Sequence, residues 1–155
     1  VIATDHCSFD FHGDKQNGKD DFTKCPNGAP GVETRMPIVF SEGVSKGRLS
    51  LNEFAAVTST NPAKIFGMYP KKGVLAPGSD ADIVLMNPDM EVTITKNILH
   101  ENVDYTPYEG IQVKGWPVMT MVRGQAVVEN ERLQVPLGFG RYINRKPVKY
   151  TELLK

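Results

Sequence analysis

The first residues of the chain constrain its fold most. Val1-Ile2-Ala3-Thr4-Asp5 is a short apolar run that ends at an acid. Val and Ile favour strands, and such a run bounded by polar residues is typical of a buried parallel strand. An acid at the carboxyl end of such a strand lies where α/β barrels keep their chemistry. The sequence begins inside this element, with no Met and no turn before it, so we expect it to be part of a longer chain.

Composition narrows the class of protein. The 155 residues are 40% hydrophobic, which is normal for about one domain with a core. Lys and Arg balance Asp and Glu at 18 each, which argues against nucleic-acid or membrane-surface binding, since both need excess basic charge. No apolar run approaches the roughly 20 residues that span a bilayer. Cys7 and Cys25 make no disulfide framework, which favours a reduced cytoplasmic setting.

Acids and histidines crowd the segment around the end of the apolar run, at Asp5, His6, Asp10, His12 and Asp14. The segment is either a complete metal site or a solvated loop, and spacing alone favours the loop, because Asp and Gly abound in turns. The three histidines, His6, His12 and His100, include no His-x-His pair. A complete zinc site would therefore have to combine distant residues. If a metal binds, we expect most of its ligands to lie outside this chain.

Residues 20–31 are rich in Gly and Pro, which predicts a loop. Asn27-Gly28 can form a tight turn, because both residues tolerate a positive φ. An ordinary connection is the simpler interpretation of this loop. The alternative is a loop that holds its backbone N–H and C=O groups still for a ligand.

Helical periodicity begins after Arg35. An apolar stripe is formed by Met36, Val39, Phe40 and Val44. Pro37 then has to lie in the first turn, where its missing N–H leaves no bond unmade. Gly47 is the expected end of this helix.

A second helical stretch is predicted from Ser50, where Ser50-Leu51-Asn52-Glu53 is a capping box. Asn61-Pro62 then reads as the cap and first residue of a further short helix. We expect that helix to carry Ile65 and Phe66 inward and to end at Gly67.

The pattern changes near Tyr69 and indicates a β module. Residues 81–86 read as a strand that is apolar on both faces, and residues 92–95 alternate as a half-buried strand should. Apolar runs at 118–122 and 126–128 flank Arg123-Gly124, a good two-residue hairpin turn. The boundary between the helical and β parts is predicted at about residues 68–72.

The tail, residues 136–155, is rich in Gly, Pro and basic side chains, with Glu152 as its one acid. A nucleic-acid-binding tail is one interpretation. A solvated or subunit-crossing arm is favoured, because the neutral overall charge offers no wider basic face.

Several blocks of the sequence closely resemble the hydantoinase/dihydropyrimidinase branch of the amidohydrolase superfamily. The blocks are Thr4-Asp5-His6-Cys7-Ser8-Phe9, Gly18-Lys19-Asp20-Asp21-Phe22-Thr23-Lys24, Pro26-Asn27-Gly28, Gly31-Val32-Glu33-x-Arg35, Ser59-Thr60-Asn61-Pro62-Ala63-Lys64-Ile65-Phe66, and Pro70-Lys71-Lys72-Gly73 with Gly78-Ser79-Asp80-Ala81-Asp82-Ile83-Val84. The last block marks only the superfamily, whereas those around Asp5 and Asn27 are more specific. The resemblance covers essentially the whole chain but only the last third or so of such an enzyme.

The resemblance implies an α/β fold, a (β/α)8 TIM barrel beside a β-sandwich. Residues 1–68 would supply the last barrel strand, its loop and the closing helices, and residues 69–135 the C-terminal part of the sandwich. Residues 136–155 would form an arm that reaches a neighbouring subunit of a homotetramer. The order derived from the residues, strand, loop, helices and β module, fits this arrangement.

The resemblance also implies a site with two zinc ions that share a carboxylated lysine and a bridging hydroxide. Of the remaining ligands, four histidines and one aspartate, only the aspartate falls in this chain, as Asp5. Asp5 would ligate one zinc, accept the proton of the attacking hydroxide and pass it to the leaving nitrogen. Asn27 matches the residue that binds the cyclic imide edge of the substrate, largely through its backbone. His6 and Cys7 adjoin the metal without being ligands, and a Cys7 nucleophile is disfavoured because the hydroxide makes a thiol unnecessary.

The implied activity is zinc-dependent opening of hydantoins or 5,6-dihydropyrimidines to N-carbamoyl amino acids. The 155 residues alone are expected to be inactive. One alternative is a non-catalytic dihydropyrimidinase-related scaffold protein, a branch that lacks the metal ligands, whereas this chain keeps Asp5. Another is a sibling enzyme such as allantoinase or dihydroorotase, which the context of Cys7-Ser8-Phe9 and Pro26-Asn27-Gly28 makes less favoured.

Overall fold

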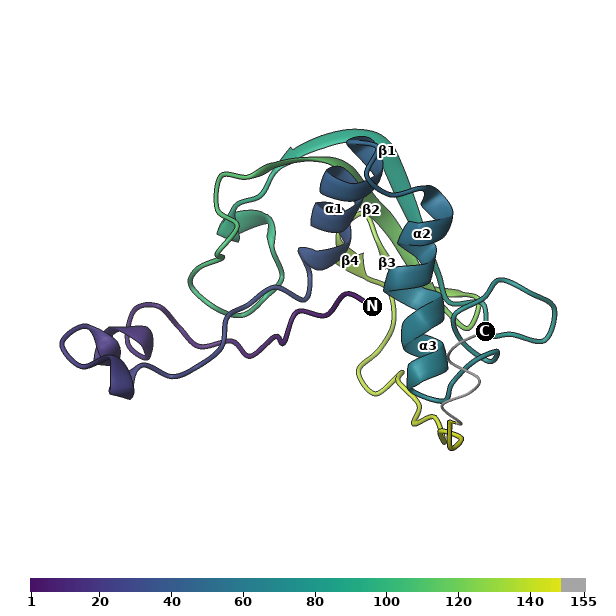
Figure 1. Cartoon of the computed structure of the whole chain (residues 1–155), viewed down its shortest axis with the longest axis horizontal. Helices are drawn as coiled ribbons and strands as arrows, with labels where there is room; N and C mark the ends of the chain where they lie inside the picture. The colour runs from purple at the N-terminus through teal and green to yellow at the C-terminus, as the bar shows by residue number, and fades with distance from the viewer. Residues whose placement is uncertain (149–155) are drawn as a thin grey trace.

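A computed structural model of the chain describes residues 1–148 (Figure 1). Residues 1–30 form a projection with two limbs, which are joined where the Cys7 amide donates to the Ala29 carbonyl at 3.2 Å. The first limb leads to two single turns of 3-10 helix, η1 (Lys15–Gly18) and η2 (Phe22–Lys24). The rest of the described chain forms two helical stretches packed beside one antiparallel sheet.

The buried strand predicted over the first residues is wrong for this chain. Residues 1–10 belong to no strand, and Val1 is 62% exposed. A strand needs a neighbouring strand to complete its hydrogen bonds, and no described strand lies against this run. The Ile2 amide instead donates to the carbonyl of Val57, in a helix, at 3.1 Å.

The first predicted helix is confirmed. α1 (Arg35–Val39) continues without a break into the π-helical turn η3 (Phe40–Ser45). Pro37 lies in the first turn, and Gly47 follows the end with a φ of +68°. The Phe40 ring packs edge-to-face on Phe54 of the second helical stretch, with centroids 5.4 Å apart.

The second helical stretch starts at the predicted capping box. The Ser50 hydroxyl accepts from the Glu53 amide and the Glu53 carboxylate accepts from the Ser50 amide. From there α2 (Leu51–Ala55), the π-helical η4 (Ala56–Thr60) and α3 (Asn61–Ile65) form one continuous helix.

The separate helix predicted to start at Asn61-Pro62 is therefore wrong, since Thr60 and Asn61 both have helical backbone angles. Ile65 and Phe66, expected to point inward, are 45% and 52% exposed. Ala63 is the buried residue of this turn, and Ile65 lies roughly 200° round the helix from it. Phe66 is already the C-terminal cap, and Gly67 ends the helix as predicted, with a φ of +68°.

The predicted hairpin is confirmed. β2 (Gln112–Val122) pairs with β3 (Gln125–Glu129) across Arg123-Gly124, whose φ values are +53° and +78°. β4 (Arg132–Leu133) follows after a second tight turn at Asn130-Glu131.

The two strands predicted at 81–86 and 92–95 form most of one long strand, β1 (Ile83–Thr93), which pairs with β2 and shifts register between Asn87 and Glu91. The described sheet has the order β1-β2-β3-β4 and is antiparallel throughout. The two-layer sandwich remains a prediction.

The core lies between β2, the segment after β1, and the turn η5 (Lys96–Ile98). Its buried cluster consists of Ile94, Leu99, Val113 and Trp116. Gly115 lets the helical layer lie directly on β2, because a Cβ there would be 2.2 Å from the Phe40 ring. The domain division predicted at residues 68–72 stays a prediction.

The described part of the tail touches its own chain at two places. The Arg123 guanidinium donates to the Phe139 carbonyl at 2.9 Å and stacks on the Phe139 ring. The Lys146 amide donates to the Gly67 carbonyl at 3.0 Å. The last part of the predicted arm, residues 149–155, lies outside the described residues.

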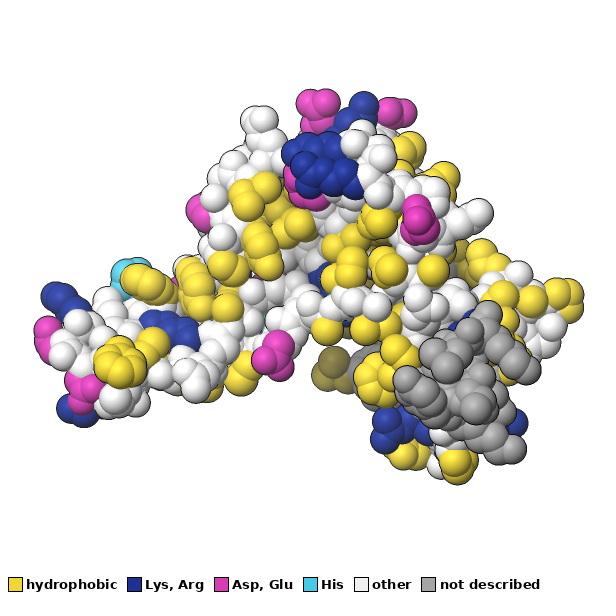
Figure 2. Space-filling view, viewed as in Figure 1, with side chains coloured by type: hydrophobic (Ala, Val, Ile, Leu, Met, Phe, Trp, Pro, Cys, Tyr) yellow, Lys and Arg dark blue, Asp and Glu magenta, His cyan; other side chains and the backbone are white. Residues whose placement is uncertain are grey.

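Large apolar side chains stand open to solvent over much of the surface (Figure 2). Leu137 is 95% exposed, Tyr142 87% and Phe22 84%. None of the helices within residues 1–148 combines the length and the apolar character needed to cross a membrane.

Candidate active site

Asp5 lies on a stretch of backbone that is held on both sides. Its own φ is +50°, a left-handed conformation that is strained for a residue other than Gly, and its side chain is exposed. Three residues earlier the Ile2 amide is bound to Val57, and two residues later the Cys7 amide is bound to Ala29. These anchors fix where the carboxylate is presented.

The anchor at Val57 follows from the proline in the second helix. In the π-helical η4 each amide donates five residues back, so that the Asn61 amide binds the Ala56 carbonyl. The next amide in that pattern belongs to Pro62, which has no N–H. The Val57 carbonyl is thus left without a helical donor, and the Ile2 amide supplies one.

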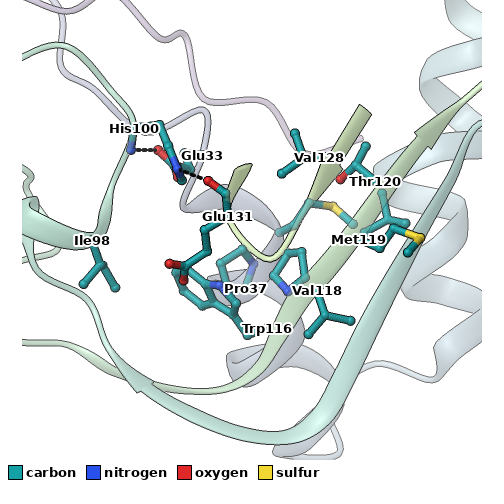
Figure 3. Close-up of a pocket in the computed structure, with 13 residues that line it drawn as sticks. Glu33, Pro37, Ile98, His100, Trp116, Val118, Met119, Thr120, Val128 and Glu131 are labelled. Atoms are coloured by element: carbon teal, nitrogen blue, oxygen red, sulfur yellow. Dashed lines mark hydrogen bonds and ion pairs between the residues drawn. The ribbon is translucent and has the colours of Figure 1, made fainter. Parts of the chain in front are cut away.

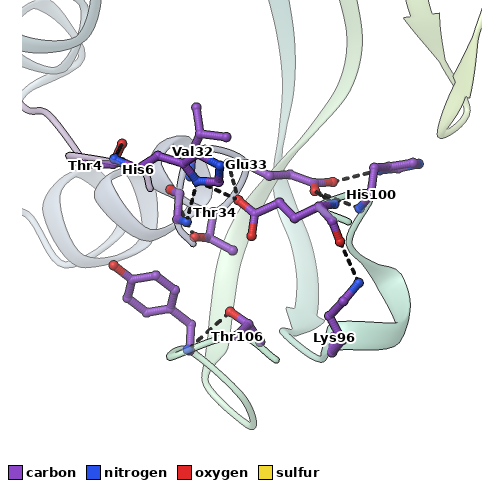
Figure 4. A network of polar contacts seen from close by, with 11 residues as sticks. Thr4, His6, Val32, Glu33, Thr34, Lys96, His100 and Thr106 are labelled. Carbon is purple, nitrogen blue, oxygen red and sulfur yellow. Dashed lines mark hydrogen bonds and ion pairs between the residues drawn. The ribbon is translucent and has the colours of Figure 1, made fainter. Parts of the chain in front are cut away.

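His6 is fixed by the loop that precedes α1 (Figure 4). Its Nδ1 atom accepts from the amides of Gly31 and Val32, at 3.1 and 3.3 Å. A nitrogen that accepts these bonds carries no proton. The same atom is 3.8 Å from the Glu101 carboxylate, which lies on the other side of the loop.

Glu33 and Glu101 tie that loop to the segment after η5 (Figure 4). Glu101, whose side chain is 5% exposed, accepts from the Glu33 amide at 3.1 Å. Glu33 accepts in return from the amides of His100 and Glu101, at 2.7 and 3.3 Å. The backbone that holds His6 is therefore braced against the segment after η5 by two carboxylates, one from each side.

Asn27 lies close to this stretch, in an exposed position. The tight turn predicted at Asn27-Gly28 is wrong, since only Gly28 has a positive φ, +118°, and the chain runs on without a turn. A Cβ at Gly28 would be 2.4 Å from the Cys7 carbonyl oxygen. The structure thus brings the Asn27 segment into direct backbone contact with the segment of Asp5. The roles of Asp5 and Asn27 as metal ligand, catalytic residue and substrate-binding residue remain predictions.

The polar cluster around Asp5 forms no metal cage of its own. No group of three or more His, Cys, Asp or Glu side chains that could hold a metal ion occurs among residues 1–148. Asp104 accepts from the amides of His12 and Phe11, and these bonds lower the pKa of its carboxyl. The exposed carboxylate of Asp5 suits zinc as one ligand, so the chain fits a metal to which other residues supply the remaining ligands.

Sequence reasoning missed Lys15 and Glu33. Lys15 donates to two carbonyls beside Asn27, and a lone lysine in a polar stretch gives no signal of such a contact. Glu33 stands in the block Gly31-Val32-Glu33-x-Arg35, which marked the resemblance without indicating a role. A glutamate fixed within a Gly-containing motif is the one signal that could have drawn attention to it.

An apolar cavity of about 350 Å³ lies between α1 and the sheet (Figure 3). Pro37 and Trp116 line it, and Glu33, His100 and Glu131 stand together at one end. Neither Asp5 nor Asn27 contributes to its lining. The cavity is therefore distinct from the candidate site.

Known proteins resemble this chain in both sequence and fold. Residues 1–127 match the model of the amidohydrolase family. The chain is 47% identical over 154 residues to a D-hydantoinase of Geobacillus stearothermophilus, which covers 99% of this chain and 32% of the relative. It is 46% identical over 147 residues to a D-phenylhydantoinase of Escherichia coli, covering 95% and 32%. The crystal structure of dihydropyrimidinase from Brevibacillus agri NCHU1002 superposes with a TM-score of 0.94 at 50% identity, over 96% of this chain and 32% of that one. The chain thus spans about a third of the length of these relatives.

Proposed function

The chain belongs to the amidohydrolase family. On that premise we propose that it is part of a zinc-dependent cyclic amidase. In a protein of its relatives' length, this enzyme would open hydantoins or 5,6-dihydropyrimidines to N-carbamoyl amino acids. The relatives named D-hydantoinase and D-phenylhydantoinase match nearly the whole chain, which supports this substrate class. Residues 1–68 would belong to a (β/α)8 barrel and residues 69–135 to a β-sandwich.

The observation that carries the proposal is the direct contact between the Asp5 and Asn27 segments, at Gly28 and Cys7. A hydrolase of cyclic amides needs a proton carrier next to a group that holds the ring. Asp5 would accept a proton and pass it to the leaving nitrogen. Glu would place the carboxylate one methylene too far, and Asn could not carry the proton.

Asn27 would hold the ring through its backbone. A hydantoin or dihydropyrimidine offers an N–H and a C=O side by side, and a fixed backbone N–H and C=O are complementary to both. Within residues 1–148 the Asn27 N–H and C=O make no backbone hydrogen bond. Both groups are therefore free to bind a ring.

Asp5 would hold one of two zinc ions, whose other ligands, four histidines and a carboxylated lysine, would come from outside this chain. When bound, these ions would supply a nucleophile by lowering the pKa of water. The fit rests on the exposed position of Asp5, because carboxylate oxygens are ordinary zinc ligands.

We also propose that the protein is a homotetramer in which the tail reaches a neighbouring subunit. Leu137 and Tyr142, in the described part of the tail, are almost fully exposed, and apolar side chains of this kind favour burial by a partner. Light scattering on the full-length protein would give a tetramer mass, and removal of residues 136–155 would lower it. An unchanged mass in the truncated protein would exclude the tail from the interface.

The function is tested with full-length protein, purified with its metal. Opening of hydantoin and dihydrouracil, together with two zinc ions per subunit, is the expected result. Turnover of allantoin or dihydroorotate with dihydrouracil inert would replace the proposal by a sibling enzyme. No bound zinc and no ring opening would identify a scaffold protein.

Asp5→Asn tests the role of the carboxylate. We expect the fold to survive and kcat to fall by about three powers of ten, since the amide cannot carry a proton. Asp10→Asn, another exposed acid of the same segment, is the matched control and should keep wild-type kcat. Near-normal kcat in Asp5→Asn would remove Asp5 from the mechanism.

A further inference from the structure

Lys15 sits beside the Asn27 segment in an environment unusual for a lysine. Its Nζ donates to the carbonyl oxygens of Pro26 and Gly28, each at 2.5 Å. It also lies over the Phe9 ring, 5.4 Å from the centroid. No carboxylate within residues 1–148 forms an ion pair with it. The ammonium is thus partly buried and satisfied by two carbonyls and an aromatic face.

The two carbonyls are those that flank Asn27 in the chain. Holding both on one ammonium fixes the peptide plane that carries the Asn27 N–H and the plane that follows Gly28, so that the Asn27 carbonyl lies between two fixed planes. It also occupies the two neighbouring acceptors, so that the Asn27 carbonyl is the one left open in this segment. Gly28 packs on Cys7 from its other side. The Asn27 segment is therefore held by the Lys15 side chain and by the backbone of Cys7.

We propose that Lys15 is a positioning residue for substrate binding, which holds the backbone of Asn27 ready for the ring of a cyclic ureide. The inference rests on the proposed function, because it assigns a purpose to the geometry around Asn27. Lys15 itself touches neither Asp5 nor the reacting bond. It acts on affinity for the ring and leaves the chemical step to Asp5.

This division of labour predicts a kinetic signature. A backbone pair that grips the ring binds substrate and transition state about equally, and loss of such uniform binding raises KM and spares kcat. In the full-length, zinc-loaded enzyme, Lys15→Met should raise KM for dihydrouracil about tenfold, because it removes the charge-assisted hydrogen bonds to the Pro26 and Gly28 carbonyls. The kcat of this variant should stay within about threefold of the wild-type value. Lys19→Met, an exposed lysine four residues on, is the matched control and should leave both constants unchanged.

A chemical rescue distinguishes loss of the two Lys15 hydrogen bonds from a general loss of structure. Lys15→Ala removes a three-carbon ammonium, which propylammonium chloride replaces in shape and donors. The amine should restore KM several-fold in Lys15→Ala and do nothing to the wild type. Tetramethylammonium chloride, which has the charge but no N–H donor, should not rescue. Equal rescue by both salts, or rescue by neither, would contradict the proposal that the Lys15 ammonium holds the two carbonyls.

Hydrogen exchange gives a readout that does not depend on activity. Amides in the peptide covering residues 25–31 should exchange at least about tenfold faster in Lys15→Met than in Lys19→Met, because the segment loses its tether. Unchanged exchange together with unchanged KM overturns the inference while the wild type still opens the ring. A wild type that opens no cyclic ureide removes the proposed function and the positioning role together, and faster exchange then leaves Lys15 as a structural brace alone.

Discussion

His100 couples protonation to the packing of the loop that holds His6. Its Nδ1 lies 2.7 Å from the Glu33 carboxylate and its Nε2 3.0 Å from the Glu131 carbonyl oxygen (Figure 3). Both contacts need an N–H, so the charged imidazolium satisfies them together. The bond to Glu33, then that to the Glu131 carbonyl, raises the pKa of His100 above its ordinary value.

A raised pKa in the folded protein fixes the sign of the pH dependence. The contribution of His100 to stability is complete below the unfolded pKa of roughly 6.5 and is lost as pH rises through the higher folded value. Because the side chain is 60% exposed, we expect less than about 1 kcal/mol.

Thermal unfolding of the full-length protein from pH 5.5 to 8.5 measures this. The difference in Tm between wild type and His100→Gln should be largest at the acid end and shrink as pH rises. A difference that grows with pH would contradict the assignment of the proton.

The residues that the sequence could predict are those whose partners lie close in the chain. Ser50 and Glu53 were predicted correctly because a capping box is complete within four residues. Lys15 reaches carbonyls 11 and 13 residues away, and His6 binds amides 25 and 26 residues away. Such contacts depend on how two limbs of a loop fold together, which no local pattern encodes.

For helices and strands too, predictions were right where the interacting residues lie close together in the sequence. The Arg123-Gly124 hairpin was predictable because its turn chemistry is local. The helix start at Asn61-Pro62 was wrong because the π-helical turn before it accommodates a proline that an α-helix would not. The strand at residues 1–7 was wrong because pairing depends on a neighbour that the described residues do not supply.

The proline in the second helix gives an element-level prediction. Pro62→Ala restores an amide that can donate to the Val57 carbonyl, and so competes with the amide of Ile2. We expect a more regular helix, since Ala is favoured over Pro by about 3 kcal/mol in a helix interior. The cost should appear at the candidate site, as faster amide exchange in residues 1–5 of the full-length protein.

Pro77→Ala, at an exposed proline outside the helix, is the control for this change. Unchanged exchange at residues 1–5 in Pro62→Ala would mean that the Ile2 anchor does not depend on the missing N–H. Faster exchange in both variants would point to a general loosening of the protein.

For the whole molecule, the balance of surface and core is unusual. The chain exposes 10675 Å², whereas a compact monomer of 17.1 kDa exposes roughly 7,800 Å². Within residues 1–148 the buried hydrophobic residues are few: Phe40, Phe54, Ala63, Ile94, Leu99, Val103, Val113 and Trp116. Burial of apolar surface is the main favourable term in folding, so this arrangement needs further polypeptide against its open faces.

The 155 residues alone should therefore fold poorly and open no ring. We expect a broad, weakly cooperative melt and strong binding of the dye ANS, as for chains with exposed apolar surface and loose packing. The full-length protein should melt sharply and bind little dye. A sharp melt of the isolated chain would show that its small core suffices, and the exposed side chains in Figure 2 would then be ordinary surface. A broad melt that sharpens when the missing two thirds of the relatives' length is added as a separate chain would identify these faces as the internal contacts of one larger enzyme.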